Sequence, residues 1–129
     1  WGNDLVVYPK LDRMREVRAK SLLADARLRG VSYRGTGNEP GWMVEIGPAT
    51  RLLFVTNFGE ERHEFGGLST RGVDATGVTV FMARHGDQEI KVTVTREGCT
   101  DDMAGVEFDH RMVVEFAGQT LRGCGSAVR

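Results

Sequence analysis

Residues 78–96 read VTVFMARHGDQEIKVTVTR, in which two runs of alternating side chains flank a short turn. The second run is the clearer one, because Ile90, Val92 and Val94 take every other position and polar residues lie between them. An alternation with a period of two is typical of a β-strand with one buried and one solvent-facing side. This stretch therefore predicts an antiparallel hairpin, with strands over 78–84 and 89–96.

The rest of the chain after Gly30 continues this pattern. We expect residues 35–40 to form a turn and residues 98–110 a longer polar loop. Eight short strands then follow one another as a meander, and closure into a barrel removes the unpaired edges. The expected fold is mainly β: a small eight-stranded antiparallel meander forming a closed or nearly closed barrel, with a sandwich as the alternative. The other six expected strands cover residues 31–34, 41–46, 51–56, 62–68, 111–116 and 119–124.

A helix is expected before the barrel. Residues 11–28 contain no glycine or proline, and Gly30 follows as a natural helix stop. The expected organisation is an N-terminal arm and basic amphipathic helix over residues 1–29, then one β-barrel domain over residues 30–129. The apolar stripe along one face of the helix consists of Leu11, Met14, Val17, Leu22 and Leu28, with Ser21 and Ala24 filling it.

The net charge of −1 conceals an uneven distribution. Residues 1–29 carry seven Lys or Arg and four Asp or Glu, a formal charge of +3, whereas residues 30–129 carry ten and fourteen, a charge of −4. Two interpretations stay open: the basic helix packs on its own acidic domain, or it lies near an anionic membrane surface. Neither part is basic enough to indicate a nucleic-acid partner. No apolar run approaches the roughly 20 residues of a transmembrane helix.

The two cysteines, Cys99 and Cys124, allow a disulfide, two buried thiols or half of a metal site. A disulfide is favoured, because each cysteine lies at the end of an expected strand and no third or fourth soft ligand accompanies them. A disulfide in turn favours an oxidising compartment. The sequence begins at Trp1 without a methionine, so we expect an upstream segment, such as a signal peptide, to have been removed.

Two polar segments supply candidate site residues. The segment GNEPGW, residues 37–42, predicts either a specific turn in which Trp42 plugs one barrel end, or a rim that contacts a ligand. Four acidic residues lie between positions 101 and 109, but their spacing does not match a calcium-binding EF-hand loop, so a solvated acidic loop is favoured. The candidate rim residues for a ligand or partner are Asn38, Glu39, Trp42, Asp101 and Asp102.

Residues that would indicate catalysis or a cofactor form no recognisable arrangement. The three histidines stand on separate elements without metal-site spacing, and we expect His63 and His85 at solvent-exposed positions. Ser126 lacks the sequence surround of a nucleophile elbow. The chain also has no phosphate loop and no dinucleotide fingerprint. The sequence therefore predicts no enzyme activity, no metal and no cofactor.

Three short motifs carry a resemblance to a known family. GNEPGW at 37–42, CTDDM at 99–103 and LRGC at 121–124 resemble small uncharacterised bacterial envelope proteins whose pattern runs GNEPFW, then C-x-D-x-M and L-x-G-C. Those proteins are similar to META-domain lipoproteins and, more loosely, to membrane-bound inhibitors of c-type lysozyme, which are small disulfide-held β-barrels. The resemblance covers about residues 31–125 and implies an envelope location and a binding or stress-related role. Gly41 departs from the family, which usually has an aromatic residue there.

These observations together predict a non-enzymatic binding module in the periplasm or at the outer membrane. The expected partner is an envelope protein, such as a lysozyme, and the oligomeric state is left open. The alternative is a carrier that holds a small apolar ligand inside the barrel, since eight strands leave an interior either just filled or able to hold one small ligand. Bulky residues expected to point inward favour a filled interior: Trp42, Phe54, Phe81, Met112 and Phe116.

Overall fold

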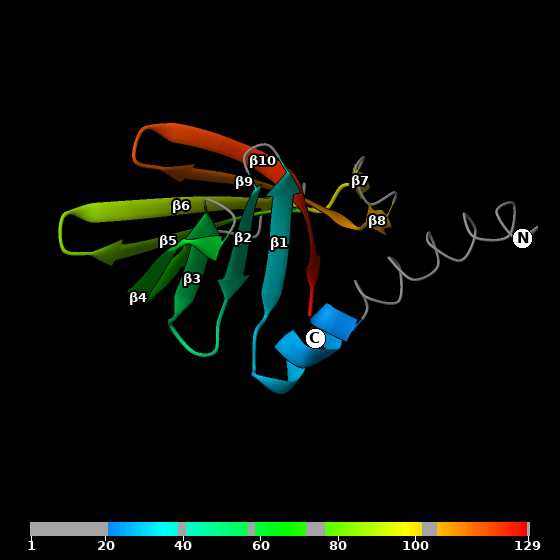
Figure 1. The fold of residues 1–129 in the computed structure, drawn as a ribbon, viewed down its shortest axis with the longest axis horizontal. Helices are drawn as coiled ribbons and strands as arrows, with labels where there is room; N and C mark the ends of the chain where they lie inside the picture. The colour runs from blue at the N-terminus through cyan, green and yellow to red at the C-terminus, as the bar shows by residue number, and fades with distance from the viewer. Residues whose placement is uncertain (1–20, 39–40, 57–58, 72–76, 102–105, 129) are drawn as a thin grey trace, which may run out of the picture.

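The computed structural model of the chain describes residues 21–38, 41–56, 59–71, 77–101 and 106–128. Within these residues, a short helix at 21–28 precedes ten β-strands, eight of which close into a barrel in the order β1-β10-β9-β6-β5-β4-β3-β2 (Figure 1). The predicted mainly β fold, a closed eight-stranded antiparallel barrel after a helix, is confirmed. The barrel strands are β1 Tyr33–Asn38, β2 Gly41–Ile46, β3 Leu52–Thr56, β4 Glu61–Arg71, β5 Val78–His85, β6 Gln88–Thr95, β9 His110–Phe116 and β10 Gln119–Ala127.

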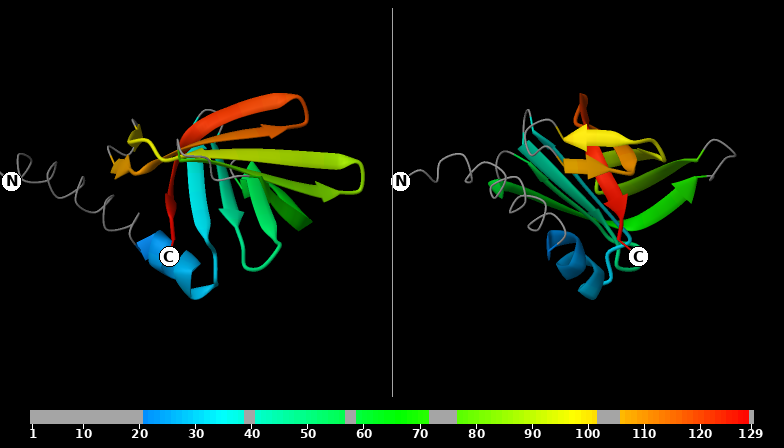
Figure 2. Two further views of the ribbon diagram at one scale, coloured as in Figure 1. Left: turned by 180° about the vertical axis from the view of Figure 1, so that it is seen from behind. Right: turned by 90° about the vertical axis from the view of Figure 1, so that its right-hand side faces the viewer.

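The two remaining strands, β7 (Cys99–Asp101) and β8 (Val106–Phe108), form a separate two-stranded sheet outside the barrel (Figures 1 and 2). Barrel pairing bypasses them, because β6 pairs directly with β9. The expectation of a polar loop over residues 98–110 is therefore wrong in part. Each strand of this hairpin has only three residues, which is too short for an alternation to be recognised in a sequence.

Strand β1 closes the barrel by pairing with β2 on one side and β10 on the other. The expected turn at 35–40 is wrong for residues 35–38, which belong to this strand. A Cβ atom on Gly35 would lie 2.1 Å from Met112 Sδ, and one on Gly37 would lie 2.0 Å from Trp42 Nε1. Glycine is needed at both positions because the buried side chains of Met112 and Trp42 occupy the space that a side chain would take.

The barrel interior is filled by side chains from alternate strand positions. All five bulky residues expected to point inward belong to this core or pack against it, and among them only Phe116 is partly buried. The 14 buried members are Trp42, Val44, Ile46, Leu52, Phe54, Phe65, Phe81, Ala83, Ile90, Val92, Val94, Met112, Val114 and Leu121.

The helix before the barrel ends where the sequence predicts. Gly30 has a φ of 82°, and its N–H donates to the carbonyl oxygen of Arg27 at 3.0 Å. The N–H of Val31 donates to the carbonyl oxygen of Ala26 at 3.0 Å, which completes a Schellman stop. Ala26 and Val31 are buried together with Val128 in a small second cluster. The helix therefore packs beside the end of β10, close to the C-terminus of the chain (Figure 2).

A buried carboxylate fixes the end of this helix to the barrel wall. Glu45 of β2 is 4% exposed, and its two oxygens accept hydrogen bonds from Nη1 and Nη2 of Arg29 at 2.7 and 2.8 Å. Arg34 of β1 adds a second cation, with Nε 3.4 Å from Oε2 of Glu45. A two-pronged contact between arginine and carboxylate is strong and directional. The ion cluster and the apolar cluster together give the helix one orientation on its own domain.

Arginine contacts lower the pKa of Glu45 below its ordinary value of 4.5, above all through the hydrogen bonds from Arg29, while burial opposes this shift. A carboxylate whose pKa is lower in the folded than in the unfolded chain stabilises the fold when it is ionised. That stabilisation is present above the ordinary pKa and is lost as the pH falls through the lower folded pKa. Acid therefore weakens the docking of the helix.

Substitution of Gly37 by alanine should destabilise the barrel by about 2 kcal/mol or more, because the buried ring of Trp42 has no space to move aside. Gly66 is the matched control, since it lies in β4 and a Cβ atom there would meet nothing within 4 Å. Urea denaturation of Gly37→Ala and Gly66→Ala measures both effects. Equal, small losses of stability would contradict the packing assigned to Gly37.

Glu45→Gln keeps the shape of the side chain and removes its charge. We expect the free energy of unfolding at neutral pH to fall by about 1–2 kcal/mol, a modest value because Arg29 is half exposed. The difference between wild type and variant should shrink as the pH falls from about 6 to about 3, because Glu45 of the wild type then becomes neutral as well. Thermal unfolding over this pH range measures the difference, and a constant difference would rule out the assigned role.

Candidate functional site

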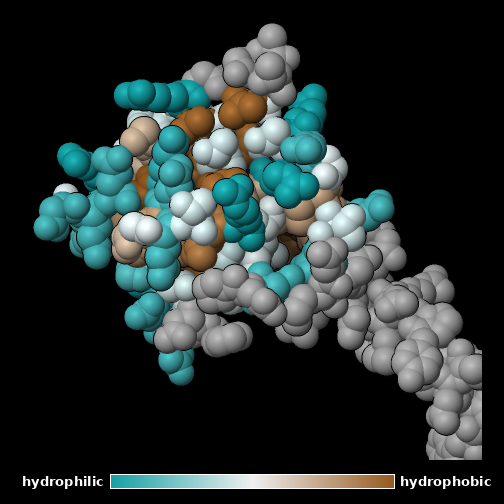
Figure 3. Space-filling view, turned by 90° about the horizontal axis from the view of Figure 1, so that it is seen from above, coloured by the Kyte–Doolittle hydropathy of each residue, from teal (hydrophilic) through white to brown (hydrophobic). Residues whose placement is uncertain are grey.

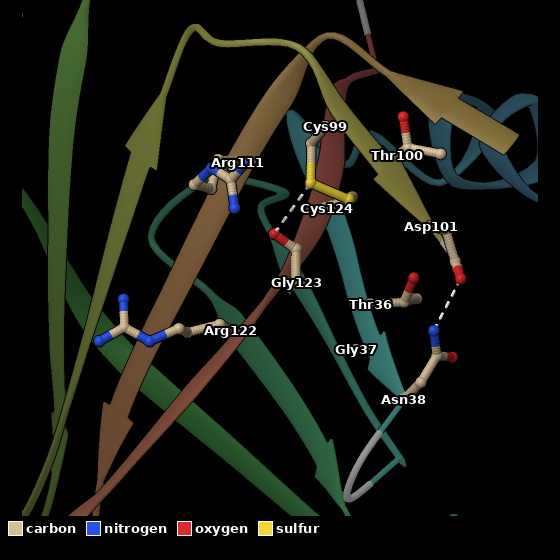
Figure 4. Close-up of a pocket in the computed structure, with 10 residues that line it drawn as sticks. All are labelled: Thr36, Gly37, Asn38, Cys99, Thr100, Asp101, Arg111, Arg122, Gly123 and Cys124. Atoms are coloured by element: carbon tan, nitrogen blue, oxygen red, sulfur yellow. Dashed lines mark hydrogen bonds between the residues drawn. A yellow bond between two sulfur atoms is a disulfide. The ribbon is translucent and has the colours of Figure 1, made fainter. Parts of the chain in front are cut away.

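A groove on the outer wall of the barrel brings together the motifs that stand out in the sequence. It has a volume of about 460 Å³ and lies where β1 and β10 pair, beside the strand β7 (Figure 4). Four strands supply its lining: Thr36, Gly37 and Asn38 from β1, Cys99, Thr100 and Asp101 from β7, Arg111 from β9, and Arg122, Gly123 and Cys124 from β10.

Asn38 and Asp101 meet at one edge of this groove, although they are 63 residues apart in the sequence. Nδ2 of Asn38 donates a hydrogen bond to Oδ1 of Asp101 at 2.6 Å (Figure 4). Asn38 is the last residue of β1 and Asp101 the last residue of β7. The hydrogen bond therefore ties the barrel rim to the outer hairpin, and two of the predicted rim residues are direct neighbours.

The disulfide between Cys99 and Cys124 holds the hairpin β7–β8 against the barrel. Gly123 and Gly125 face the barrel interior, so the side chain of Cys124 between them points outward and reaches Cys99. Sγ of Cys99 also lies 3.5 Å from the carbonyl oxygen of Gly123, a contact without a hydrogen bond because a disulfide carries no proton. The favoured disulfide is confirmed. It excludes the two alternatives, a pair of buried thiols and half of a metal site.

Two guanidinium groups line the side of the groove away from Asp101 (Figure 4). Nε of Arg111 lies 3.4 Å from Oε2 of Glu97, and both of these side chains are about half exposed. Arg122 is exposed, and the described residues give it no ion pair. Arg111 pairs across the strands with Cys124, two positions from Arg122 on the same outer face, so the arginines are diagonal neighbours.

Of the other predicted rim residues, only Trp42 is described, and it does not line the groove. Trp42 is 5% exposed and packs against Phe54 with 6.5 Å between ring centroids, so its ring belongs to the core. Glu39 and Asp102 lie outside the described residues. Arg122 was missed by sequence reasoning, although strand alternation from Cys124 within LRGC places it on the same outer face.

Of the three histidines, His85 is exposed at the end of β5, as the sequence predicts, whereas the other two are more buried. His63 is partly buried and stacks on Phe54 with 6.1 Å between ring centroids, so the expectation of an exposed position is wrong. The reason is that His63 packs among inward-facing aromatic rings of the core. His110 is 8% exposed, and its Nδ1 lies 2.9 Å from Oδ1 of Asp109. Among the described residues, no group of three or more His, Cys, Asp or Glu could hold a metal ion.

Comparisons with known proteins add no assignment to this geometry. No protein-family model, no curated protein and no solved structure matches the chain. Within the described ranges, no helix is long and apolar enough to cross a membrane. The candidate site is therefore the groove at β1, β7 and β10, assigned from its own residues.

Replacement of both cysteines by serine should lower the free energy of unfolding by about 3.5 kcal/mol, because the disulfide closes a loop with a sequence separation of 25. The barrel should stay folded, since β6 pairs with β9 without the hairpin. Amide hydrogen exchange measures this: the amides of Thr100 and Glu107 should lose protection, while those of Val92 and Val114 keep it. Loss of protection throughout the barrel would show that the hairpin is part of its folding unit.

Proposed function

We propose that this protein is a non-enzymatic binding module of the bacterial cell envelope, in the periplasm or at the outer membrane, and that its groove binds a partner protein. The observation that carries the proposal is the convergence of GNEPGW, CTDDM and LRGC on a single groove. The hydrogen bond from Asn38 to Asp101 and the disulfide at Cys99 hold this groove in shape. A preformed site loses less conformational entropy when a partner binds.

Charge favours a partner that presents carboxylates to the groove. Asp101 is engaged by Asn38 at one edge, whereas Arg122 has no ion pair within the described residues and Arg111 has only a long one of 3.4 Å. Guanidinium groups bind carboxylates through paired hydrogen bonds. A protein that offers a carboxylate-lined cleft therefore fits this side of the groove, and a c-type lysozyme, whose cleft holds two catalytic carboxylates, is the first partner to test.

Two observations support the envelope as the location. The disulfide Cys99–Cys124 is typical of proteins that fold in an oxidising compartment. The resemblance of the motifs to small bacterial envelope proteins, which are loosely similar to lysozyme inhibitors, points the same way. A partner in the periplasm or at the outer membrane is consistent with both.

A carrier of small apolar ligands remains the second candidate, and it has less support. Such a carrier needs an interior cavity, whereas Phe54, Ile90 and Met112 at the centre of the barrel are each at most 1% exposed. On the outside, the face seen in Figure 3 carries hydrophobic areas broken up by hydrophilic residues. Recognition through polar groups of the outer wall fits this surface better than capture of an apolar molecule.

The test is titration of purified protein with c-type lysozyme by calorimetry, together with an assay of lysozyme activity. We expect saturable binding with inhibition. Arg122→Glu should weaken binding at least about tenfold, because it sets like charges against each other across the interface. Arg51→Glu is the matched control: it makes the same charge change at an exposed arginine without an ion pair in the described residues, just before β3. Its affinity should stay near that of the wild type.

A partner other than lysozyme is covered by affinity capture from envelope extract with the same three proteins. A protein retained by wild type and Arg51→Glu but lost with Arg122→Glu would keep the groove as the binding site and replace the partner. No lysozyme binding and no protein whose capture depends on Arg122 would overturn the proposal.

A further inference from the structure

The helix before the barrel carries both of the large hydrophobic side chains that the described residues expose. Leu28 is 88% exposed and Leu22 is 40% exposed. A single exposed leucine is ordinary on a protein surface. Here, however, the exposed leucines are confined to one short helix, whereas the large apolar side chains of the described barrel strands are buried or half-buried. This concentration indicates that the helix meets something apolar.

The exposure of Leu28 follows from the way the helix is docked. Ala26 is fully buried and Leu23 is partly buried against the barrel. Because each residue of an α-helix turns by about 100°, Leu28 lies about 200° around the axis from Ala26 and so points away from the barrel. The two hydrogen bonds from Arg29 to Glu45 hold the helix, and with it Leu28, in this orientation. Of the apolar stripe expected from the sequence, Ser21, Ala24 and Leu28 are exposed on this outer side, whereas Leu22 lies about 40° around the axis from Ala26, beside the docked face.

The charges around Leu28 are cationic or neutralised. Arg27 is exposed and has no ion pair within the described residues. Asp25 lies between the two leucines, but its Oδ2 is 2.9 Å from Nε of Arg29. Residues 1–29 carry +3 and residues 30–129 carry −4. A negatively charged surface would therefore attract Arg27, and it would attract the basic N-terminal part of the sequence more strongly than the acidic part that follows.

We propose that this helix lies on an anionic lipid bilayer, with Leu28 at the boundary of the acyl chains and Arg27 among the headgroups. Exposed apolar side chains flanked by cations are the signature of a helix that rests in the membrane interface. The contact is separate from the groove. The helix packs against Val31 and Val128, just before the first residue of β1, whereas the groove lies toward Asn38, the last residue of β1 (Figures 1 and 2).

This arrangement would present the groove away from the lipid. Strand β1 has six residues, which span about 20 Å at the rise of a β-strand. A partner could therefore reach the groove while the helix stays on the membrane. The proposal does not depend on what the groove binds, because vesicle binding is measured without any partner protein.

The experiment is co-sedimentation of the full 129-residue chain with vesicles of phosphatidylcholine alone or mixed with phosphatidylglycerol. We expect binding that requires phosphatidylglycerol and falls as salt is raised. Leu28→Gln should weaken binding about tenfold or more, since it removes a leucine from the apolar phase. Arg27→Gln should weaken vesicle binding about fivefold, because it removes the attraction of one cation to the anionic surface. Neither substitution should alter thermal stability, because both side chains are exposed.

Arg84→Gln is the matched control, since its side chain is 70% exposed on β5, and its vesicle binding should equal that of the wild type. Absence of binding to vesicles with phosphatidylglycerol at low salt would overturn the proposal. Binding that Leu28→Gln leaves unchanged would overturn it too, because Leu28 would then make no contact with the lipid. A change of mass in sedimentation equilibrium with Leu28→Gln, without a change in vesicle binding, would instead assign the face to a second copy of the chain.

Discussion

Closure of this barrel depends on close contact between large buried side chains and three glycines, Gly35, Gly37 and Gly123, which form a seam between β1 and β10. At the junction of β1 and β10, Cβ atoms on Gly35 and Gly37 would collide with Met112 and Trp42, and one on Gly123 would lie 2.0 Å from the carbonyl oxygen of Thr36. Side chains on the inner face of these strands would push the seam apart. With glycines inside, the neighbouring outward residues of the same strands, Thr36 and Cys124 among them, form the wall of the groove. The packing of the core and the shape of the outer surface are thus determined by the same positions.

Features of the fold that depend on neighbouring residues could be predicted from the sequence, whereas features that depend on distant contacts could not. The alternation of β5 and β6 could be read directly, because side-chain burial repeats every second residue. The glycines at 35 and 37 led to a wrong expectation of a turn, since the same residue type serves tight turns and close packing, and only the distant Trp42 and Met112 decide between them. For the same reason, the contact of Asn38 with Asp101 could not be predicted, whereas the outward position of Arg122 follows from strand alternation within LRGC. The contact joins the ends of β1 and β7, which lie 63 residues apart, so no short segment contains it.

The helix and the barrel are joined by two contacts of different kinds. Burial of Ala26 with Val31 and Val128 is apolar and insensitive to pH, whereas the contact of Arg29 with Glu45 depends on an ionised carboxylate. Glu45 lies between Val44 and Ile46, whose side chains belong to the core. One strand therefore links the core with the surface on which the helix docks. The orientation of the helix relative to the barrel is a property of β2 as much as of the helix itself.

The position of β7 and β8 has a consequence for how this protein can evolve. Because β6 pairs directly with β9, the hairpin is an excursion of the chain that the barrel does not need for its own hydrogen bonding. Among its described residues, the disulfide at Cys99 and the hydrogen bond between Asn38 and Asp101 help attach it to the barrel. Substitutions, insertions or deletions within the excursion can therefore accumulate without unfolding the scaffold, provided that Cys99 is kept. Selection could diversify specificity at one wall of the groove while the opposite wall, which the barrel strands β9 and β10 carry with Arg111 and Arg122, stays constant.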